Sequence, residues 1–238
     1  MGDRLGNSWR IAGDGTNWGA LSNCINENSQ LQTYARPGAW NDPDLLQGTG
    51  IGSNDKATNP MGCFDKALIP QADNWYQTEQ QSRAQFSMWA VMSAPLLISA
   101  DVGQVSAYSL ETWSNQEIIA VNQELRPGGP YQGARLVGGN LTFDKTKGGS
   151  GMNVWGKLLP EGDFALVFVN NEGQAMDLTC DQKCFTDLIG DTTSDTYTVR
   201  DMWAHKDVGS LKAPYSWTAH SIPAHGGVAA FRAAPAYR

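Results

Sequence analysis

The sequence predicts an α/β unit with a parallel sheet over residues 1–125, followed by an antiparallel β-sandwich over residues 126–238. In the first part, strand-like and helix-like segments alternate at the spacing of βαβ units. In the second part, short apolar runs are separated by turns, which is typical of a sandwich. The boundary is placed near residue 126 because a linker-like stretch follows it, with Gly128, Gly129, Pro130 and Gly133.

The α/β part opens on a short strand at residues 8–11, where apolar residues alternate. A helix is expected at residues 17–27. Residues 40–46 are predicted to be a strand that runs into a loop, with Pro43 inside it.

The strongest helix prediction covers residues 78–93. Its apolar positions recur at helical spacing, and Gln81 and Arg83 are expected on the opposite, polar side. Pro95 ends this helix. Residues 96–99 then form an apolar run typical of a buried strand, and residues 110–122 are predicted as one further helix.

The second part contains four clear strand candidates. The strongest is 164–169, and the others are 153–158, 197–203 and 227–231. Their spacing, with turns between them, favours antiparallel pairing.

The composition excludes several classes of partner. The chain has 238 residues, of which 17% are charged and 41% hydrophobic, and its net charge is −7. Such an acidic chain lacks the positive surface that nucleic acid or an anionic membrane requires. No apolar stretch is long enough to span a bilayer. The first ten residues show no apolar segment of a signal peptide.

The four cysteines permit two disulfides in three connectivities. Cys180 and Cys184 could pair across a tight loop, and Cys24 and Cys63 would then form the second bridge. The alternative is four unrelated buried thiols. No metal site is predicted, because the three histidines show no ligand spacing. With one glycosylation sequon at Asn140, these features favour an oxidising compartment.

Asp14 is the first candidate for catalysis. It follows Arg10 by four residues, just beyond the predicted strand at residues 8–11. In an α/β barrel the loops after the strands hold the active site. A carboxylate there can donate a proton, and a neighbouring arginine can hold hydroxyl groups or tune its charge. The alternative is an ordinary turn at Asp14 and Gly15.

A second candidate is the segment from Trp40 to Leu45, which contains Asp42 and Asp44. Two aspartates in an apolar setting are able to hydrogen-bond a polyhydroxylated ligand or to bind Ca²⁺. The EF-hand register is absent. The alternatives are an Asx-turn before Pro43 and, for Trp40, a place in the core instead of against a sugar ring.

Together these segments resemble a known family. Residues 6–14, 38–46, 79–90, 93–99 and 115–123 are similar to late barrel motifs of α-galactosidases, glycoside hydrolase family 27. The resemblance implies the C-terminal part of a (β/α)₈ TIM barrel, from about the sixth strand, followed by an antiparallel β-sandwich. It implies cleavage of terminal α-linked galactose with retention of configuration, without a metal or organic cofactor.

Individual residues match the family's site. By resemblance, Asp14 is the acid/base, Arg10 contacts the sugar near that acid, and Asp44 hydrogen-bonds the sugar. Trp40 and Leu45 match positions on the same wall, and Leu45 stands where relatives often carry methionine.

The family's nucleophile lies on an earlier strand that has no match here. We therefore expect the C-terminal portion of a longer enzyme, inactive as the chain stands, with an α-galactoside as substrate and a secreted, lysosomal or vacuolar location. The alternatives are a catalytically inactive carbohydrate-binding or structural relative and, among enzymes, an α-N-acetylgalactosaminidase or a β-L-arabinopyranosidase. The sequence does not predict an oligomeric state.

Overall fold

The computed structural model describes residues 2–15, 17–46, 48, 77–99, 102, 105–144, 148–190 and 196–236. Cys63 and most of the glycine-rich stretch at residues 48–52 lie outside these ranges.

Every α-helix in the described residues begins directly after a side chain that accepts a hydrogen bond from an amide of its first turn. The helices are α1 (Trp18–Asn28), α2 (Glu79–Val91), α3 (Ala107–Trp113), α4 (Gln116–Gln123) and α5 (Gln182–Ile189), capped by Asn17, Thr78, Ser106, Asn115 and Asp181. For α2 the cap is reciprocal, because the Gln81 side chain accepts from the Thr78 amide. The single helix predicted at residues 110–122 is wrong, since the Asn115 cap starts a separate α4.

The first strands confirm the α/β alternation. β1 (Ser8–Arg10) pairs in parallel with β2 (Trp40–Asp42), and α1 connects them. Beyond β2, Leu46 forms a parallel bridge with Ile98, after α2. The prediction that residues 96–99 form a buried strand is wrong on burial, because Leu97 is 52% exposed and Ile98 is 42% exposed.

The remaining strands are antiparallel, as predicted for the second part. They are β3 (Ala134–Val137), β4 (Thr142–Asp144), β5 (Gly148–Ser150), β6 (Met152–Leu158), β7 (Phe164–Asn170), β8 (Met176–Cys180), β9 (Tyr197–Asp201), β10 (Lys206–Leu211), β11 (Trp217–Ile222) and β12 (Gly227–Pro235). Six of them form one sheet in the order β10-β9-β12-β7-β6-β3. β8 pairs with β11, and β4 with β5.

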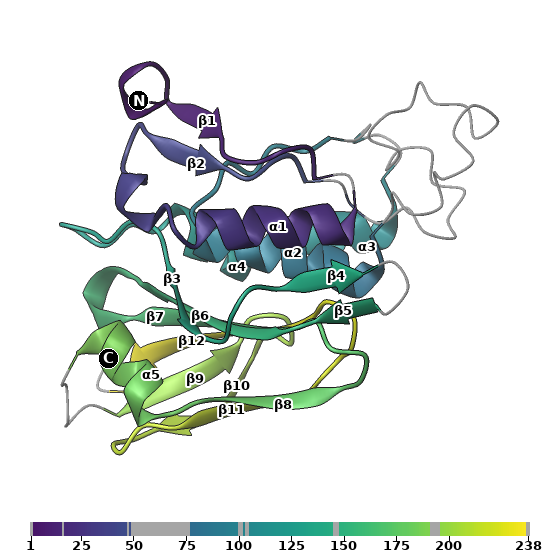
Figure 1. Cartoon of the computed structure of the whole chain (residues 1–238). Coiled ribbons are helices and arrows are strands. Elements are labelled where there is room, and N and C mark those ends of the chain that lie inside the picture. The colour runs from purple at the N-terminus through teal and green to yellow at the C-terminus, as the bar shows by residue number, and fades with distance from the viewer. Residues whose placement is uncertain are drawn as a thin grey trace.

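The elements stack in layers, as Figure 1 shows: β1 and β2, then the helices α1, α2 and α4, then the six-stranded sheet, then β8 and β11. The six-stranded sheet is therefore covered on both faces, and every residue of β7 is buried. Its side chains alternate. Val167 belongs to the core against the helices, and Phe168 to the core against β8, β11 and α5.

The proposed boundary near residue 126 falls between α4 and β3, yet one core crosses it. Residues from α1, α2 and α4 pack in the same cluster as Trp155, Val167 and Ala230 of the sheet. Ion pairs join the same layers, since Arg200 of β9 binds Glu117 of α4 at 2.9 Å. The helix layer and the sheet thus form a continuous structure.

Lys157 of β6 is a buried cation at this junction. It is 1% exposed, and its Nζ donates to the carbonyl oxygens of Val121 and Asn122 at the end of α4. Burial lowers the pKa of Lys157 to about 7, although Glu124 opposes the shift. The folded chain therefore releases this proton at a lower pH than the unfolded chain does.

This pKa predicts a pH dependence of stability. Between about pH 7 and pH 10.5 the unfolded chain holds the proton more tightly, so the free energy of unfolding rises with pH in that window. From pH 7 to pH 9 the rise assigned to Lys157 is on the order of 2 kcal/mol. We expect Lys157→Met to remove it, as measured by urea unfolding at several pH values. Identical pH profiles for the two proteins would contradict the assignment.

Candidate active site

Arg10 joins two carboxylates at the ends of neighbouring parallel strands. It is the last residue of β1, and its Nη2 lies 2.9 Å from Oδ2 of Asp44 and 3.4 Å from Oδ1 of Asp14. The same nitrogen donates to the Gly13 carbonyl oxygen at 3.1 Å. The structure thus brings together three of the residues predicted for the site, at the edge where strands of a barrel carry their active sites.

Asp44 is buried, with a side chain only 7% exposed, and both of its carboxylate oxygens are engaged. Oδ2 accepts from Arg10 and from the Gly15 amide at 2.6 Å, and Oδ1 accepts from the Leu45 amide at 2.7 Å. Its backbone has a φ of 117°, a conformation that residues other than glycine rarely adopt. The Asp42 side chain stabilises this turn by accepting from the Asp44 amide at 3.0 Å.

Asp14 has a contrasting environment. Its side chain is 83% exposed, and among the described residues it forms an ion pair only with Arg10, at the long distance of 3.4 Å. A carboxylate that is held loosely and open to water is able to exchange protons and to move toward a substrate. One arginine therefore lies between a buried, hydrogen-bonded carboxylate and an exposed one.

Cys24 of α1 lies beneath the same loop. It is buried, and its Sγ lies 3.7 Å from the Gly13 carbonyl oxygen. Burial first, and then the charge of Asp44, raise the pKa of this thiol to about 12. The thiol stays protonated near neutrality, so Cys24 packs and donates a weak hydrogen bond but is no thiolate nucleophile.

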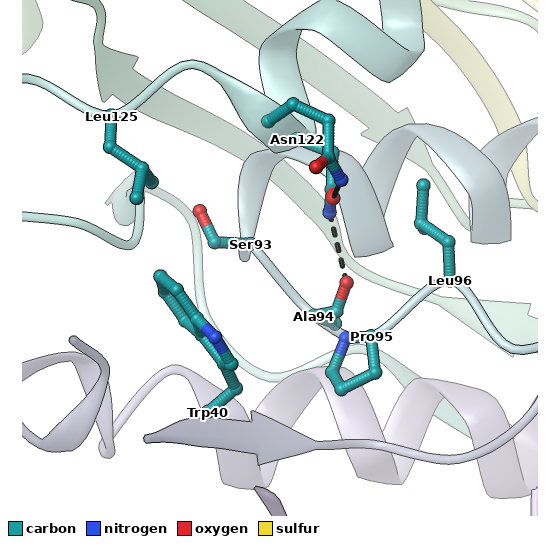
Figure 2. A pocket seen from close by; sticks show the side chains of 8 residues that line it. Trp40, Ser93, Ala94, Pro95, Leu96, Asn122 and Leu125 are labelled. Atoms are coloured by element: carbon teal, nitrogen blue, oxygen red, sulfur yellow. Dashed lines mark hydrogen bonds between the residues drawn. The ribbon is translucent and has the colours of Figure 1, made fainter. Parts of the chain in front are cut away.

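Leu45 lies next to Asp44 and is 37% exposed, in keeping with a place on the site wall. Trp40 does not join it. It is the first residue of β2, so it lies at the opposite end of the strand from Asp44. Its ring faces a separate pocket, shown in Figure 2, which Ser93, Pro95, Asn122 and Leu125 also line. The structure therefore does not bring Trp40 together with Leu45, and a role for Trp40 in binding a sugar stays a prediction.

Three of the four cysteines lie in the described residues, where two form a disulfide and one is a free thiol. Cys180 and Cys184 form the predicted disulfide, between the end of β8 and the first turn of α5. Among the described residues Cys24 is a free thiol near the Gly13 carbonyl oxygen, and the predicted Cys24–Cys63 bridge involves Cys63, which lies outside them. Asn140 is exposed, and its Oδ1 accepts from Arg135 at 3.1 Å. Its glycosylation remains a prediction.

Within the described ranges, no group of three or more histidine, cysteine, aspartate or glutamate side chains is arranged to hold a metal ion. In the same ranges, no helix combines the length and the apolar character that a bilayer crossing requires.

The sequence patterns did not identify the α2 residues that hydrogen-bond the backbone of the turn at Asp44 and Leu45. Helical spacing predicts Trp89 to be one of the apolar positions of the helix at residues 78–93, and it predicts no role for Gln85. Both belong to α2, and both donate to backbone carbonyls at this turn. The sequence does contain one signal of a polar helix face, because Gln77, Gln81 and Gln85 recur every four residues. In the structure all three side chains are buried.

Comparisons with known proteins agree with the resemblance. Residues 149–233 match the family model of the α-galactosidase C-terminal β-sandwich domain, and residues 68–124 match that of α-galactosidase A. An α-galactosidase of Oryza sativa is 33% identical over 203 residues, which cover 85% of this chain and 39% of the relative. The chain thus spans about two fifths of the length of that relative.

Two solved structures show the same fold. α-Galactosidase I of Mortierella vinacea matches with a TM-score of 0.71 and 22% identity, over 97% of this chain and 54% of the other. A family 27 β-L-arabinopyranosidase of Geobacillus stearothermophilus matches with a TM-score of 0.71 and 18% identity, over 97% and 45%. The resemblance to the C-terminal portion of α-galactosidases is confirmed.

The packing around Gly15 predicts that a side chain at this position is strained against buried Leu21. A Cβ on Gly15 would lie 2.7 Å from Cδ2 of Leu21 and 3.4 Å from Oδ2 of Asp44. We expect Gly15→Ala to lower the free energy of unfolding by about 1–3 kcal/mol, since either the loop or the buried Leu21 side chain must shift. Gly13→Ala is the matched control, because a Cβ there meets nothing within 4 Å. Chemical denaturation of both variants measures the difference, and equal losses would contradict the packing argument.

Proposed function

We propose that this chain, with its confirmed resemblance to the C-terminal portion of family 27 α-galactosidases, carries the acid/base part of a retaining glycoside hydrolase. The substrate is a terminal α-linked galactoside. In this proposal residues 1–125 are the last part of a (β/α)₈ barrel, and residues 126–238 are its β-sandwich domain. The observation that carries the proposal is the sharing of Arg10 by Asp14 and Asp44 at neighbouring strand ends.

The environments of the two aspartates separate their roles. Asp14, exposed and loosely held, is the general acid that protonates the leaving oxygen and then the base that activates water. Asp44, buried with both oxygens engaged, is unsuited to attack the anomeric carbon, because it would have to give up the hydrogen bonds from Arg10, Gly15 and Leu45. It is suited to fix Arg10 and to accept from a sugar hydroxyl.

A retaining enzyme needs a second carboxylate about 5–5.5 Å from the acid, as nucleophile. Since Asp44 is committed to structural hydrogen bonds, we assign the nucleophile to a segment other than the described residues. Exposed Leu45 lies beside Asp44, where an apolar side chain contacts one face of a sugar ring. The proposed location is secreted, lysosomal or vacuolar, which the Cys180–Cys184 disulfide supports.

The role of Asp14 is tested in the polypeptide encoded by the whole reading frame that contains residues 1–238. We expect Asp14→Ala to lower kcat on a galactoside with a poor leaving group roughly 10²–10⁴-fold, because the leaving oxygen is no longer protonated. Azide should partly restore turnover of an activated aryl galactoside. Asp187→Ala, which removes an exposed partner of Lys183 on α5, is the matched control. Unchanged turnover in Asp14→Ala would refute the assignment.

The location of the nucleophile is tested with the 238-residue chain itself. We expect it to leave p-nitrophenyl α-galactoside unhydrolysed, while the whole reading frame hydrolyses it and releases α-galactose first, as followed by proton NMR. Hydrolysis by the purified 238-residue chain would place the nucleophile within it. Inactivity of both polypeptides, with sugar binding retained, would favour the inactive carbohydrate-binding relative.

A further inference from the structure

Asp44 is held in its unusual backbone conformation by a helix that does not itself enter the site. Its φ of 117° costs free energy, so neighbouring groups must stabilise it. Trp89 and Gln85, one turn apart on α2, point at the same turn. The Trp89 indole Nε1 donates to the Asp44 carbonyl oxygen at 2.7 Å, and Gln85 Nε2 donates to the Leu45 carbonyl oxygen at 2.9 Å.

These two hydrogen bonds act on consecutive peptide groups. A peptide plane is rigid, so fixing its carbonyl oxygen also fixes the direction of the N–H on its other side. With the carbonyls of Asp44 and Leu45 fixed, the peptide groups on both sides of Leu45 are defined. The Leu45 amide then points at Oδ1 of Asp44, at 2.7 Å.

Burial makes both bonds costly to lose. Trp89 and Gln85 are 0% and 1% exposed, and Gln85 is in turn oriented by Gln77, whose Nε2 donates to Gln85 Oε1 at 2.9 Å. A carbonyl oxygen left without its donor in such a place is strongly disfavoured. The turn therefore has one well-defined arrangement, in which Oδ2 of Asp44 meets both the Gly15 amide and Arg10.

We propose that Trp89 and Gln85 are positioning residues, which hold the Asp44–Leu45 turn so that the Asp44 carboxylate orients Arg10 and the Gly15 loop. Neither side chain touches the substrate in this arrangement. The link from this turn to sugar affinity rests on the proposed function, but the positioning itself does not.

The test compares two buried tryptophans in the 238-residue chain. Trp89→Phe removes the indole donor to Asp44. Trp155→Phe is the matched control, because Trp155 is also 0% exposed but its Nε1 has no partner among the described residues. Two-dimensional ¹H–¹⁵N NMR follows the amides of Gly15 and Leu45, with the Val167 amide of β7 as an internal reference for global stability.

We expect Trp89→Phe to shift the Gly15 and Leu45 resonances and to speed their hydrogen exchange at least tenfold relative to Val167. In Trp155→Phe the hydrogen-exchange rates of these two amides, relative to that of Val167, should stay as in the wild-type chain. If Trp89 only contributes to overall stability, Trp89→Phe would speed hydrogen exchange at all three amides to the same extent, and that result would overturn the proposal. If Trp89→Phe does not fold, Gln85→Met, which removes the donor to Leu45, decides by the same criteria.

A galactose titration separates this inference from the proposed function. If the sugar moves the Gly15 amide in the wild-type chain, Trp89→Phe should weaken that binding at least tenfold and Trp155→Phe should not. If galactose and galactosides neither bind nor react with any form of the protein, the proposed function fails. The exchange ratios at Gly15 and Leu45 still decide the positioning role.

Discussion

Helix α2 has almost no free face, and the rest of the structure is arranged around that constraint. Ten of its thirteen residues are buried between the parallel strands and the six-stranded sheet. Buried polar groups must find hydrogen-bond partners, so the helix binds both neighbouring layers. Gln85 and Trp89 bind the turn after β2, while Gln81 donates to the His225 carbonyl oxygen before β12. The helix that joins the layers therefore also sets the geometry of the site.

Local sequence patterns predicted the elements well where one physical signal dominates. The strand β7 is an unbroken apolar run, and the apolar positions of α2 recur at helical spacing, so both elements were predicted. The position of Gln81 was predicted wrongly, because periodicity assigns polar residues to the solvent side. In α2 that side is covered by other parts of the chain, and no local pattern reports a covering layer. For the same reason the exposure of Leu97 and Ile98 was not foreseen.

The candidate site was only partly predictable. The motifs located Arg10, Asp14 and Asp44, and the structure brings these three side chains together. They did not distinguish the start of a short strand from the turn that follows it, so Trp40 was placed with Leu45 although Trp40 begins β2 and Leu45 lies beyond its end. The unusual backbone of Asp44 depends on partners 40 and 45 residues away in the sequence. Contacts of that range follow from the packing of whole elements, and no short motif contains them.

The alternation along β7 separates the molecule into two independent compartments. Val167 and Phe168 are neighbours in the chain, yet their side chains enter different clusters that lie on opposite faces of one sheet. Substitutions behind the sheet, among β8, β11 and α5, are therefore shielded from α2 by a layer of backbone. A change of packing in this second core therefore reaches Asp44 only through the backbone of the sheet.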